Sequence, residues 1–169
     1  MYLLLITILY FQSHMLMKNR LLHQFLESTA EAHPQKIAIS HNNQEISYSK
    51  LNIKADHLAS HLLNLGFQKE NFSLVMTDRS VNQIIALFGT LKAGGAYIPV
   101  DTETPIKRLE IIIKKSMPKV IFTERKYLSK FKNIQNDSEI VLLDEFQFND
   151  SYEKDFSIKI DDDQQCYVI

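Results

Sequence analysis

The stretch "LKAGGAYIPVD", residues 91–101, comes closest in residue type and spacing to a phosphate-binding motif. A glycine-rich loop binds phosphate when it follows a strand and leads into a helix, because the helix N-terminus offers free backbone N–H groups. Here an apolar helical pattern precedes the two glycines and an apolar strand pattern follows them. Glycine also ends helices readily, since it adopts the left-handed conformation at little cost. The sequence therefore predicts that Gly94 ends a helix and that Gly95 and Ala96 turn the chain into a strand, without a phosphate site.

Two other patterns resemble metal sites. His57 and His61 lie four residues apart on a predicted helix, the spacing with which two histidines can bind one zinc ion. The metalloprotease glutamate and a third ligand are missing from the pattern, so we expect a solvated helix edge. The run "IDDDQQ" places consecutive aspartates at 161–163 without a glycine-containing calcium loop, so we expect a solvated turn. The sequence therefore predicts no metal ligand.

Four further polar side chains have structural explanations. Asp78 and Arg79 precede a predicted helix, and we expect a local ion pair between them. Cys166 lies in an apolar strand pattern, where a thiol behaves as an inert core side chain. Lys92 stands near the C-terminus of an apolar helix, where the dipole favours a cation, so we expect its ammonium to snorkel outward. We therefore assign no catalytic, cofactor-binding or metal-binding residue to this chain.

The composition is that of one globular domain. The chain has 169 residues, of which 45% are hydrophobic and 23% are charged, and both proportions are ordinary for a folded protein. A net charge of −1 argues against a dedicated nucleic-acid binder, which would need a basic stripe. The single cysteine excludes a disulfide framework and a four-cysteine zinc site. It also fits a reducing compartment, so we expect a cytoplasmic protein.

The N-terminus, "MYLLLITILYF", is an apolar run that is too short to span a bilayer. It shows neither the basic start nor the small-residue cleavage site of a secretory signal. Met15 and Met17 offer alternative starts shortly afterwards. We expect residues 1–17 to be a leader or an over-extended start, with membrane tethering as the open alternative, and residues 18–169 to form the domain.

From residue 18 onward, helical and strand patterns alternate. This alternation is typical of a doubly wound α/β fold with a mostly parallel sheet and flanking helices. The segment 145–165 is mostly polar and is predicted to lie on the surface, with one possible edge strand. Helices are predicted over 19–33, 48–65, 81–93, 105–116 and 124–131, and strands over 36–40, 45–48, 72–76, 97–100, 119–123, 139–144 and 166–169, the first two forming a hairpin.

Capping residues mark three of the predicted helices. Ser47 and Ser80 are the expected N-caps of the second and third helices, and Gln83 is placed to complete a capping box. Thr104 is the expected N-cap of the fourth helix, with Pro105 at the first helical position. The buried face of that fourth helix is predicted to consist of Ile106, Leu109, Ile112 and Ile113.

Four stretches, in order, resemble the amino-acid adenylation domains of nonribosomal peptide synthetases, members of the adenylate-forming superfamily. "LKAGGAYIPVD" followed by "TPIKR" is similar to the second core motif of that family, and "ISYSKLNIKADHLASHLLNLG" to its first core motif and following helix. "HPQKIAIS" resembles its early strand and "TDRS" the turn before its buried helix. The similarity covers residues 18–125 well and 126–169 more loosely, and four ordered matches are far more specific than one glycine pair.

The sequence departs from this family's pattern at Lys50, where glutamate is usual, and at Thr104, where an aromatic residue is usual. The first departure affects only a helix cap. The second leaves open whether the parent is a peptide synthetase module, a relative of the D-alanyl-carrier ligases or another superfamily member.

The resemblance implies a reaction for the parent enzyme. A carboxylate attacks the α-phosphate of ATP in the presence of magnesium, giving an acyl-adenylate and pyrophosphate, and a phosphopantetheine thiol on a carrier domain then accepts the acyl group. The family's phosphate loop, ribose-binding acid and late lysine follow the two core motifs, the loop coming directly after a strand like "CYVI". We therefore expect an incomplete N-terminal subdomain, truncated before the phosphate-binding loop, that is inactive alone and binds neither ATP nor magnesium.

Three hypotheses remain open from the sequence. The chain is a fragment of an adenylating ligase, a non-catalytic remnant or interaction module, or one half of a split enzyme. The resemblance implies an amino-acid substrate and a carrier domain as partners of the parent, whereas binding to nucleic acid or to a membrane is not expected. Because an apolar strand at 166–169 would leave an unpaired sheet edge, we expect the isolated chain to self-associate.

Overall fold

Four parallel strands form the central sheet of the structure, a computed structural model that describes residues 21–161 and 163–169. Their order across the sheet is β4–β3–β5–β6, and each adjacent pair is parallel. This is the doubly wound, parallel arrangement that the alternating patterns predict. The strands are β3 (Phe72–Val75), β4 (Ala96–Pro99), β5 (Val120–Thr123) and β6 (Glu139–Leu142).

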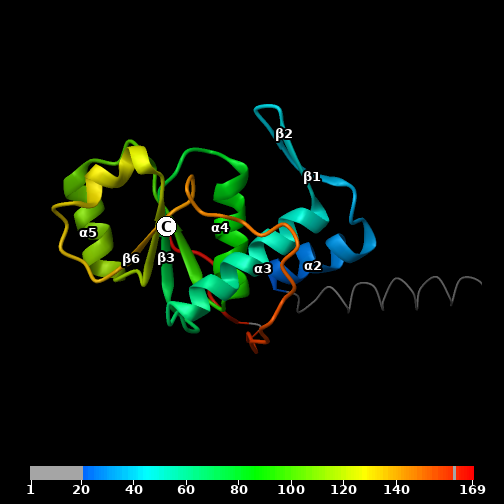
Figure 1. The fold of residues 1–169 in the computed structure, drawn as a ribbon. Helices are drawn as coiled ribbons and strands as arrows, with labels where there is room; N and C mark the ends of the chain where they lie inside the picture. Colours follow the sequence, from blue (N-terminus) through cyan, green and yellow to red (C-terminus); the bar gives the residue numbers. More distant parts are fainter. Residues whose placement is uncertain (1–20, 162) are drawn as a thin grey trace, which may run out of the picture.

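Helices cover both faces of this sheet. Figure 1 shows α5 on one side and α2, α3 and α4 on the other. An antiparallel hairpin of two strands precedes α3, as predicted. The remaining elements are α2 (Leu22–Ala32), β1 (Ile37–His41), β2 (Gln44–Ser47), α3 (Tyr48–Asn64), α4 (Val81–Lys92), α5 (Ile106–Ser116) and the 3₁₀ helix η1 (Arg125–Phe131).

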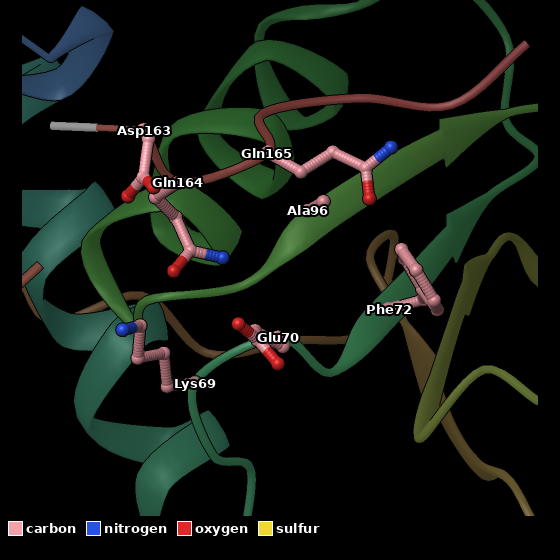
Figure 2. Close-up of a pocket in the computed structure, with 7 residues that line it drawn as sticks. All are labelled: Lys69, Glu70, Phe72, Ala96, Asp163, Gln164 and Gln165. Atoms are coloured by element: carbon pink, nitrogen blue, oxygen red, sulfur yellow. The ribbon is translucent and has the colours of Figure 1, made fainter. Parts of the chain in front are cut away.

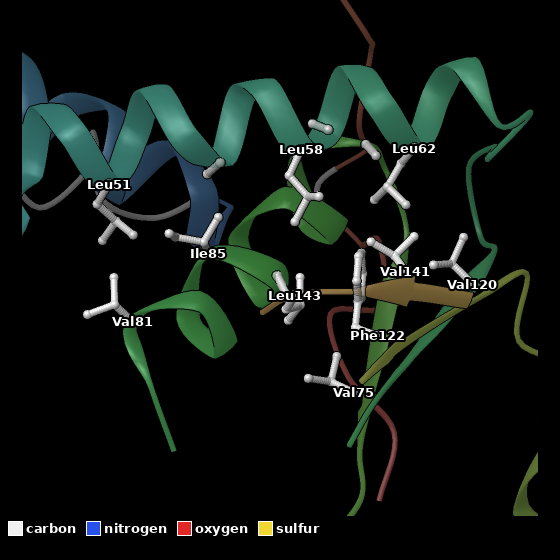
Figure 3. Close-up of a cluster of buried hydrophobic side chains, with 14 of the residues drawn as sticks. Leu51, Leu58, Leu62, Val75, Val81, Ile85, Val120, Phe122, Val141 and Leu143 are labelled. Atoms are coloured by element: carbon white, nitrogen blue, oxygen red, sulfur yellow. The ribbon is translucent and has the colours of Figure 1, made fainter. Parts of the chain in front are cut away.

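Each face of the sheet has its own hydrophobic core, because successive side chains of a strand point to opposite faces. Val75 and Phe122 belong to the larger core together with Leu58 of α3 (Figure 3). Leu74 and Ile121, one position earlier in their strands, belong to the smaller core on the side of α5. Burial on both faces explains why these strands appear in the sequence as continuous apolar runs.

The glycine pair makes the structural turn that the sequence predicts. Gly94 has φ +80°, and its N–H donates to the Leu91 carbonyl at 3.1 Å. The Gly95 N–H donates to the Thr90 carbonyl at 3.1 Å, which completes a Schellman motif. A Cβ on Gly95 would lie 2.3 Å from Cε1 of Phe67, so the following turn also requires glycine. The pair closes α4 and opens β4.

Two of the predicted N-caps are confirmed. The Ser47 hydroxyl accepts the backbone N–H of Lys50 at 3.4 Å, and the Ser80 hydroxyl accepts that of Gln83 at 3.1 Å. Each bond satisfies one of the free N–H groups at a helix start.

The start of α5 was predicted one residue too early. Pro105 is the N-cap with ψ 142°, which is extended, and helical geometry begins at Ile106. The Thr104 N–H instead donates to the Asp101 carbonyl at 3.0 Å, in a turn before the helix. Ile106 is 53% exposed, so its assignment to the buried face was wrong, while Leu109 is fully buried. The register of the helix shifts its apolar stripe away from the first turn.

Residues 145–160, called the strap below, differ most from the prediction. They were expected to be polar surface, yet Phe146, Phe148 and Phe156 pack against the larger core. The rings of Phe146 and Phe148 meet edge to face, with centroids 4.8 Å apart. The described residues of the strap contain no strand. Aromatic residues spaced among polar ones gave no periodic signal, so the packing was missed.

The predicted strand at 166–169 is reduced to one parallel bridge between Tyr97 and Tyr167. The Tyr97 N–H donates to the Cys166 carbonyl, and the Val168 N–H donates to the Tyr97 carbonyl, both at 3.0 Å. Cys166 is half-buried at this edge, so its assignment to a buried core strand was wrong.

The predicted leader, residues 1–17, lies outside the described residues, as do the first two residues of the first predicted helix. None of the helices in the described part of the chain combines the length and the apolar character that a membrane span requires.

Candidate functional site

The carboxyl edge of a parallel sheet is where α/β proteins usually bind ligands, at the point where successive connections leave in opposite directions. In this sheet that point lies between β3 and β5, because β4 follows β3 on one side and β5 lies on the other. Thr77 and Asp78 follow β3, while Thr123 ends β5 and Glu124 comes next. These four residues define the candidate site.

The carboxylate of Asp78 is paired with one cation and one hydroxyl of the chain. Lys126 forms an ion pair with it, and the Tyr127 hydroxyl donates to its Oδ1 at 2.5 Å. The bonds from Lys126 and Tyr127 hold the pKa of Asp78 below its usual value. The backbone N–H of Asp78 donates to Glu124 Oε1 at 3.2 Å, which joins the ends of β3 and β5. The predicted pair with Arg79 was therefore wrong, because η1 brings Lys126 to the same carboxylate.

An ion pair also joins the segments that follow β5 and β6 at this edge. Arg125 donates from Nε and from Nη2 to the two carboxylate oxygens of Glu145, each at 2.6 Å. The hydrogen bonds raise the pKa of Arg125 and lower that of Glu145. The Arg125 backbone N–H donates to the Asp144 carboxylate at 3.1 Å. This bidentate pair leaves neither charge directed at an incoming ligand.

The hydroxyls of Thr77 and Thr123 are the exception at this edge. Both oxygens are buried without a hydrogen-bond partner among the described residues. Thr123 is the last residue of β5, and Thr77 lies two residues beyond the end of β3.

A second group of charges lies beneath the helices and is called the ionic cluster below. The ammonium of Lys92 lies 2.7 Å from Glu27 Oε1 and 2.8 Å from Asp56 Oδ1, and the lysine side chain is 1% exposed. The prediction that this ammonium snorkels outward was wrong. The end of α4 is enclosed by α2 and α3, each of which supplies one carboxylate.

Burial and charge act against each other in the ionic cluster. Burial by itself would raise the pKa of Glu27, but the hydrogen bond and charge of Lys92 hold it below its usual value. Burial lowers the pKa of the neighbouring His23, against the attraction of Glu27. Lys154 of the strap lies 3.2 Å from the same Glu27 oxygen. The cluster thus joins α2, α3, α4 and the strap, and its charges are engaged with one another.

The two histidines of α3 pack under the strap. His57 Nδ1 accepts the backbone N–H of Asn149 at 3.1 Å, and its ring lies 5.1 Å from that of Tyr152. His61 meets the ring of Phe146 edge-on at 5.1 Å. Both histidines are half-buried under the strap, so the expectation of a solvated edge was wrong. Burial and the nearby His57 lower the pKa of His61.

The aspartate run gives no cation site in the described residues. Asp161 forms an ion pair with Lys69, and Asp163 is exposed. The middle aspartate of this predicted turn lies outside the described residues.

The resemblance implies ATP and magnesium, which require oxygen ligands for the cation and free donors for the phosphates. The part of the chain that the structure describes contains no group of three or more His, Cys, Asp or Glu side chains that could hold a metal ion. The carboxylates at the carboxyl edge are already paired with Lys126 and Arg125. The described residues therefore do not fit a magnesium nucleotide, and no reaction step is assigned to them.

Sequence reasoning missed Glu27 and Asp56. The available signal was Lys92 itself, because a charge within an almost wholly apolar helix must either reach solvent or find a buried partner. Choosing between those outcomes requires knowing which helix lies against α4, and no local pattern contains that information.

Comparison with known proteins identifies one family. The family model described as AMP-binding enzyme matches residues 26–168. Tyrocidine synthase 1 of Brevibacillus parabrevis is 37% identical over 132 residues, covering 78% of this chain and 12% of that protein. Surfactin synthase subunit 1 of Bacillus subtilis is 32% identical over 138 residues, covering 82% of this chain and 4% of that protein. The chain thus spans a small part of the relatives it matches.

Solved structures agree on the fold. The nonribosomal peptide synthetase FmoA3, in a form bound to α-methyl-L-serine-AMP, superposes with a TM-score of 0.79 at 19% identity, covering 90% of this chain and 17% of that one. A fatty acyl CoA synthetase of Mycobacterium tuberculosis superposes with a TM-score of 0.66 at 21% identity, covering 72% of this chain and 26% of that one.

Proposed function

The chain belongs to the AMP-binding enzyme family, and from that premise we propose that it works as the N-terminal part of an adenylation domain of the peptide synthetase type. The proposed reaction of the whole enzyme joins the carboxylate of an amino acid to AMP from ATP, releases pyrophosphate and passes the acyl group to a carrier thiol. The observation that carries this proposal is the family match over residues 26–168, with peptide synthetases among the relatives.

We propose that this part of the enzyme supplies architecture and no catalytic or cofactor-binding group. The ion pairs at the carboxyl edge and the ionic cluster both support this role, because their charges are directed at each other. ATP and magnesium would then be held by other parts of the whole enzyme. The amino acid and the carrier domain are proposed partners of that whole enzyme, and a cytoplasmic location remains a prediction from the single cysteine.

A chimera of this chain with a relative tests this function. Residues 26–168 would replace the matching segment of tyrocidine synthase 1, and ATP–pyrophosphate exchange would be measured with its amino-acid substrate. We expect exchange to be retained, because the segment supplies the same sheet and helices. A chimera that unfolds cooperatively yet catalyses no exchange would contradict the proposal.

An assay of the chain alone tests the proposal that it supplies no catalytic group. We expect no ATP–pyrophosphate exchange from residues 1–169 with any of the common amino acids, against intact tyrocidine synthase 1 as the positive control. Clear exchange by the chain alone would overturn the assignment.

We further propose that the isolated chain self-associates. Ile106 and Ile111 on α5 are 53% and 54% exposed, and Tyr167 beside β4 is 49% exposed. Exposed aliphatic and aromatic side chains near a sheet edge favour association. Sedimentation velocity should show species larger than a monomer, and a monomer with one sharp thermal transition would refute this.

A further inference from the structure

A cavity of about 370 Å³ lies at the amino edge of the sheet, opposite the candidate site. It forms where the loop after α3, the first residues of β3 and β4, and the segment 163–165 meet (Figure 2). Its volume falls at the lower end of the range for small-molecule sites. The residues around it are Lys69, Glu70, Phe72, Ala96, Asp163, Gln164 and Gln165.

Gln164 gives this cavity its chemical character. Both its side-chain atoms, Nε2 and Oε1, are buried and make no hydrogen bond within the described residues. Figure 2 shows this carboxamide directed toward the loop that carries Lys69 and Glu70. Leaving a donor and an acceptor unpaired and out of water costs folding free energy. A carboxamide in this state matches a ligand that presents an acceptor beside a donor.

The wall facing Gln164 is preformed. Glu70 has φ +67°, a left-handed conformation that is unfavourable for a glutamate. It is fixed there because its N–H donates to the Gly94 carbonyl at 3.1 Å, while the carbonyl of Asn71 accepts the Ala96 N–H at 3.0 Å. The loop is therefore tied to the same glycine turn that opens β4.

Charge at the cavity selects against anions. Glu70 and Asp163 are carboxylates, and Lys69, the one ammonium among the described residues of the rim, is already paired with Asp161. The hydrogen bond from Lys69 lowers the pKa of Asp161, so this carboxylate stays ionised at neutral pH. Neutral or cationic ligands are favoured by this balance, and free carboxylates or phosphates are not.

We propose that the cavity binds small neutral or cationic carboxamides, with the amide of the ligand paired side by side with the carboxamide of Gln164. A cationic amine on the same ligand would lie toward Glu70 and Asp163. This site is separate from the carboxyl edge and does not depend on the proposed adenylation function, so the chain-alone and chimera experiments do not bear on it.

Titration of the ¹⁵N-labelled full chain with three probes tests the site. We expect glycinamide, a cationic carboxamide, to shift the Gln164 side-chain NH₂ and the Glu70 amide resonances saturably, and neutral acetamide to do so more weakly. Acetate at equal ionic strength should leave both unchanged. No saturable shift with glycinamide, or equal binding of acetate, would overturn the proposal.

The variant Gln164→Leu gives a second test, because it should raise the stability of the free protein and weaken its binding of glycinamide. Removing an unpaired buried carboxamide should raise the melting temperature of the free protein by about 2–4 °C, and it should weaken glycinamide binding by about tenfold or more. Gln135→Leu, which changes an exposed glutamine outside the cavity, is the matched control and should alter neither quantity. A Gln164→Leu protein that melts lower, or that binds glycinamide as the parent does, would contradict the proposal.

Discussion

Lys92 and Lys126 each bind two carboxylates, but in opposite surroundings. Lys92 contacts Glu27 and Asp56 with its side chain 1% exposed, whereas Lys126 contacts Asp78 and Glu124 with its side chain 52% exposed. Water and salt screen the second group, while the first has no alternative to its partners. The same pairing therefore fixes how α2, α3 and α4 meet in one region and contributes little at the carboxyl edge.

Replacing Lys92 should produce the largest effect. Lys92→Met removes the cation and leaves the Asp56 carboxylate buried beside Glu27, which should cost about 3–5 kcal/mol of unfolding free energy. Urea denaturation followed by circular dichroism measures this. The double variant Lys92→Met/Asp56→Leu is the control and should recover part of the loss, because the buried carboxylate is gone. A single variant as stable as the parent would break the comparison.

The turn that follows Lys92 should be nearly as sensitive. In Gly95→Ala the new Cβ would lie 2.3 Å from the Phe67 ring and 2.6 Å from the Asn71 carbonyl oxygen, which belongs to the backbone and cannot rotate away. We expect a loss of about 3 kcal/mol from this overpacking. Gly66→Ala is the control. Its Cβ would meet nothing within 4 Å, so the loss of stability should be limited to the cost of placing alanine in a left-handed backbone, about 1–2 kcal/mol. Equal losses would refute the steric argument.

Lowering the pH should destabilise the region around His23 and His61 before it affects the carboxyl edge of the sheet. Burial lowers the pKa values of His23 and His61 in the folded chain below the 6.5 of the unfolded chain. Unfolding then takes up protons, so stability is full above pH 6.5 and falls as the pH drops toward the folded pKa values.

Urea midpoints at pH 7.5 and 5.5 measure this effect, which should be smaller than that of Gly95→Ala. His61→Gln should reduce the difference between the two pH values, whereas His33→Gln, at an exposed position, should not. A midpoint that does not fall between pH 7.5 and 5.5 would contradict the assigned burial of these rings.

Replacing Lys126 should have the smallest effect. Lys126→Met removes both of its ion pairs, yet Asp78 is 49% exposed and is hydrated when unpaired, and only Glu124, 14% exposed, loses a partner in a partly covered place, so we expect a change in unfolding free energy of at most about 1 kcal/mol. Added salt should not alter this result. A loss comparable to that of Lys92→Met would show that exposure does not separate the two regions.

The sequence predicted those parts of the fold that depend on neighbours along the chain. The helix α3, the caps at Ser47 and Ser80, and the stop at Gly94 all follow from local periodicity and backbone preference. The start of α5 at Ile106 was not predicted. The Thr104 N–H donates to the Asp101 carbonyl, so Thr104 belongs to a turn before the helix and is not its N-cap.

What the sequence did not predict depends on distant contacts. The burial of Lys92 needs carboxylates from α2 and α3, which lie 65 and 36 residues away in the chain. The strap reaches His57 across 92 residues. The pairing of Asp78 with Lys126 could not be predicted either, since it depends on where η1 lies.

The most direct measurement is ATP–pyrophosphate exchange, as a function of temperature, in the chimera that carries residues 26–168. We expect exchange in the parent chimera, loss of exchange at a lower temperature in the Lys92→Met chimera, and a profile like the parent's in the Lys126→Met chimera. A folded chimera without exchange would contradict the assigned function. Equal sensitivity of the two lysine variants would contradict the claim that the ionic cluster holds this part of an adenylation domain together.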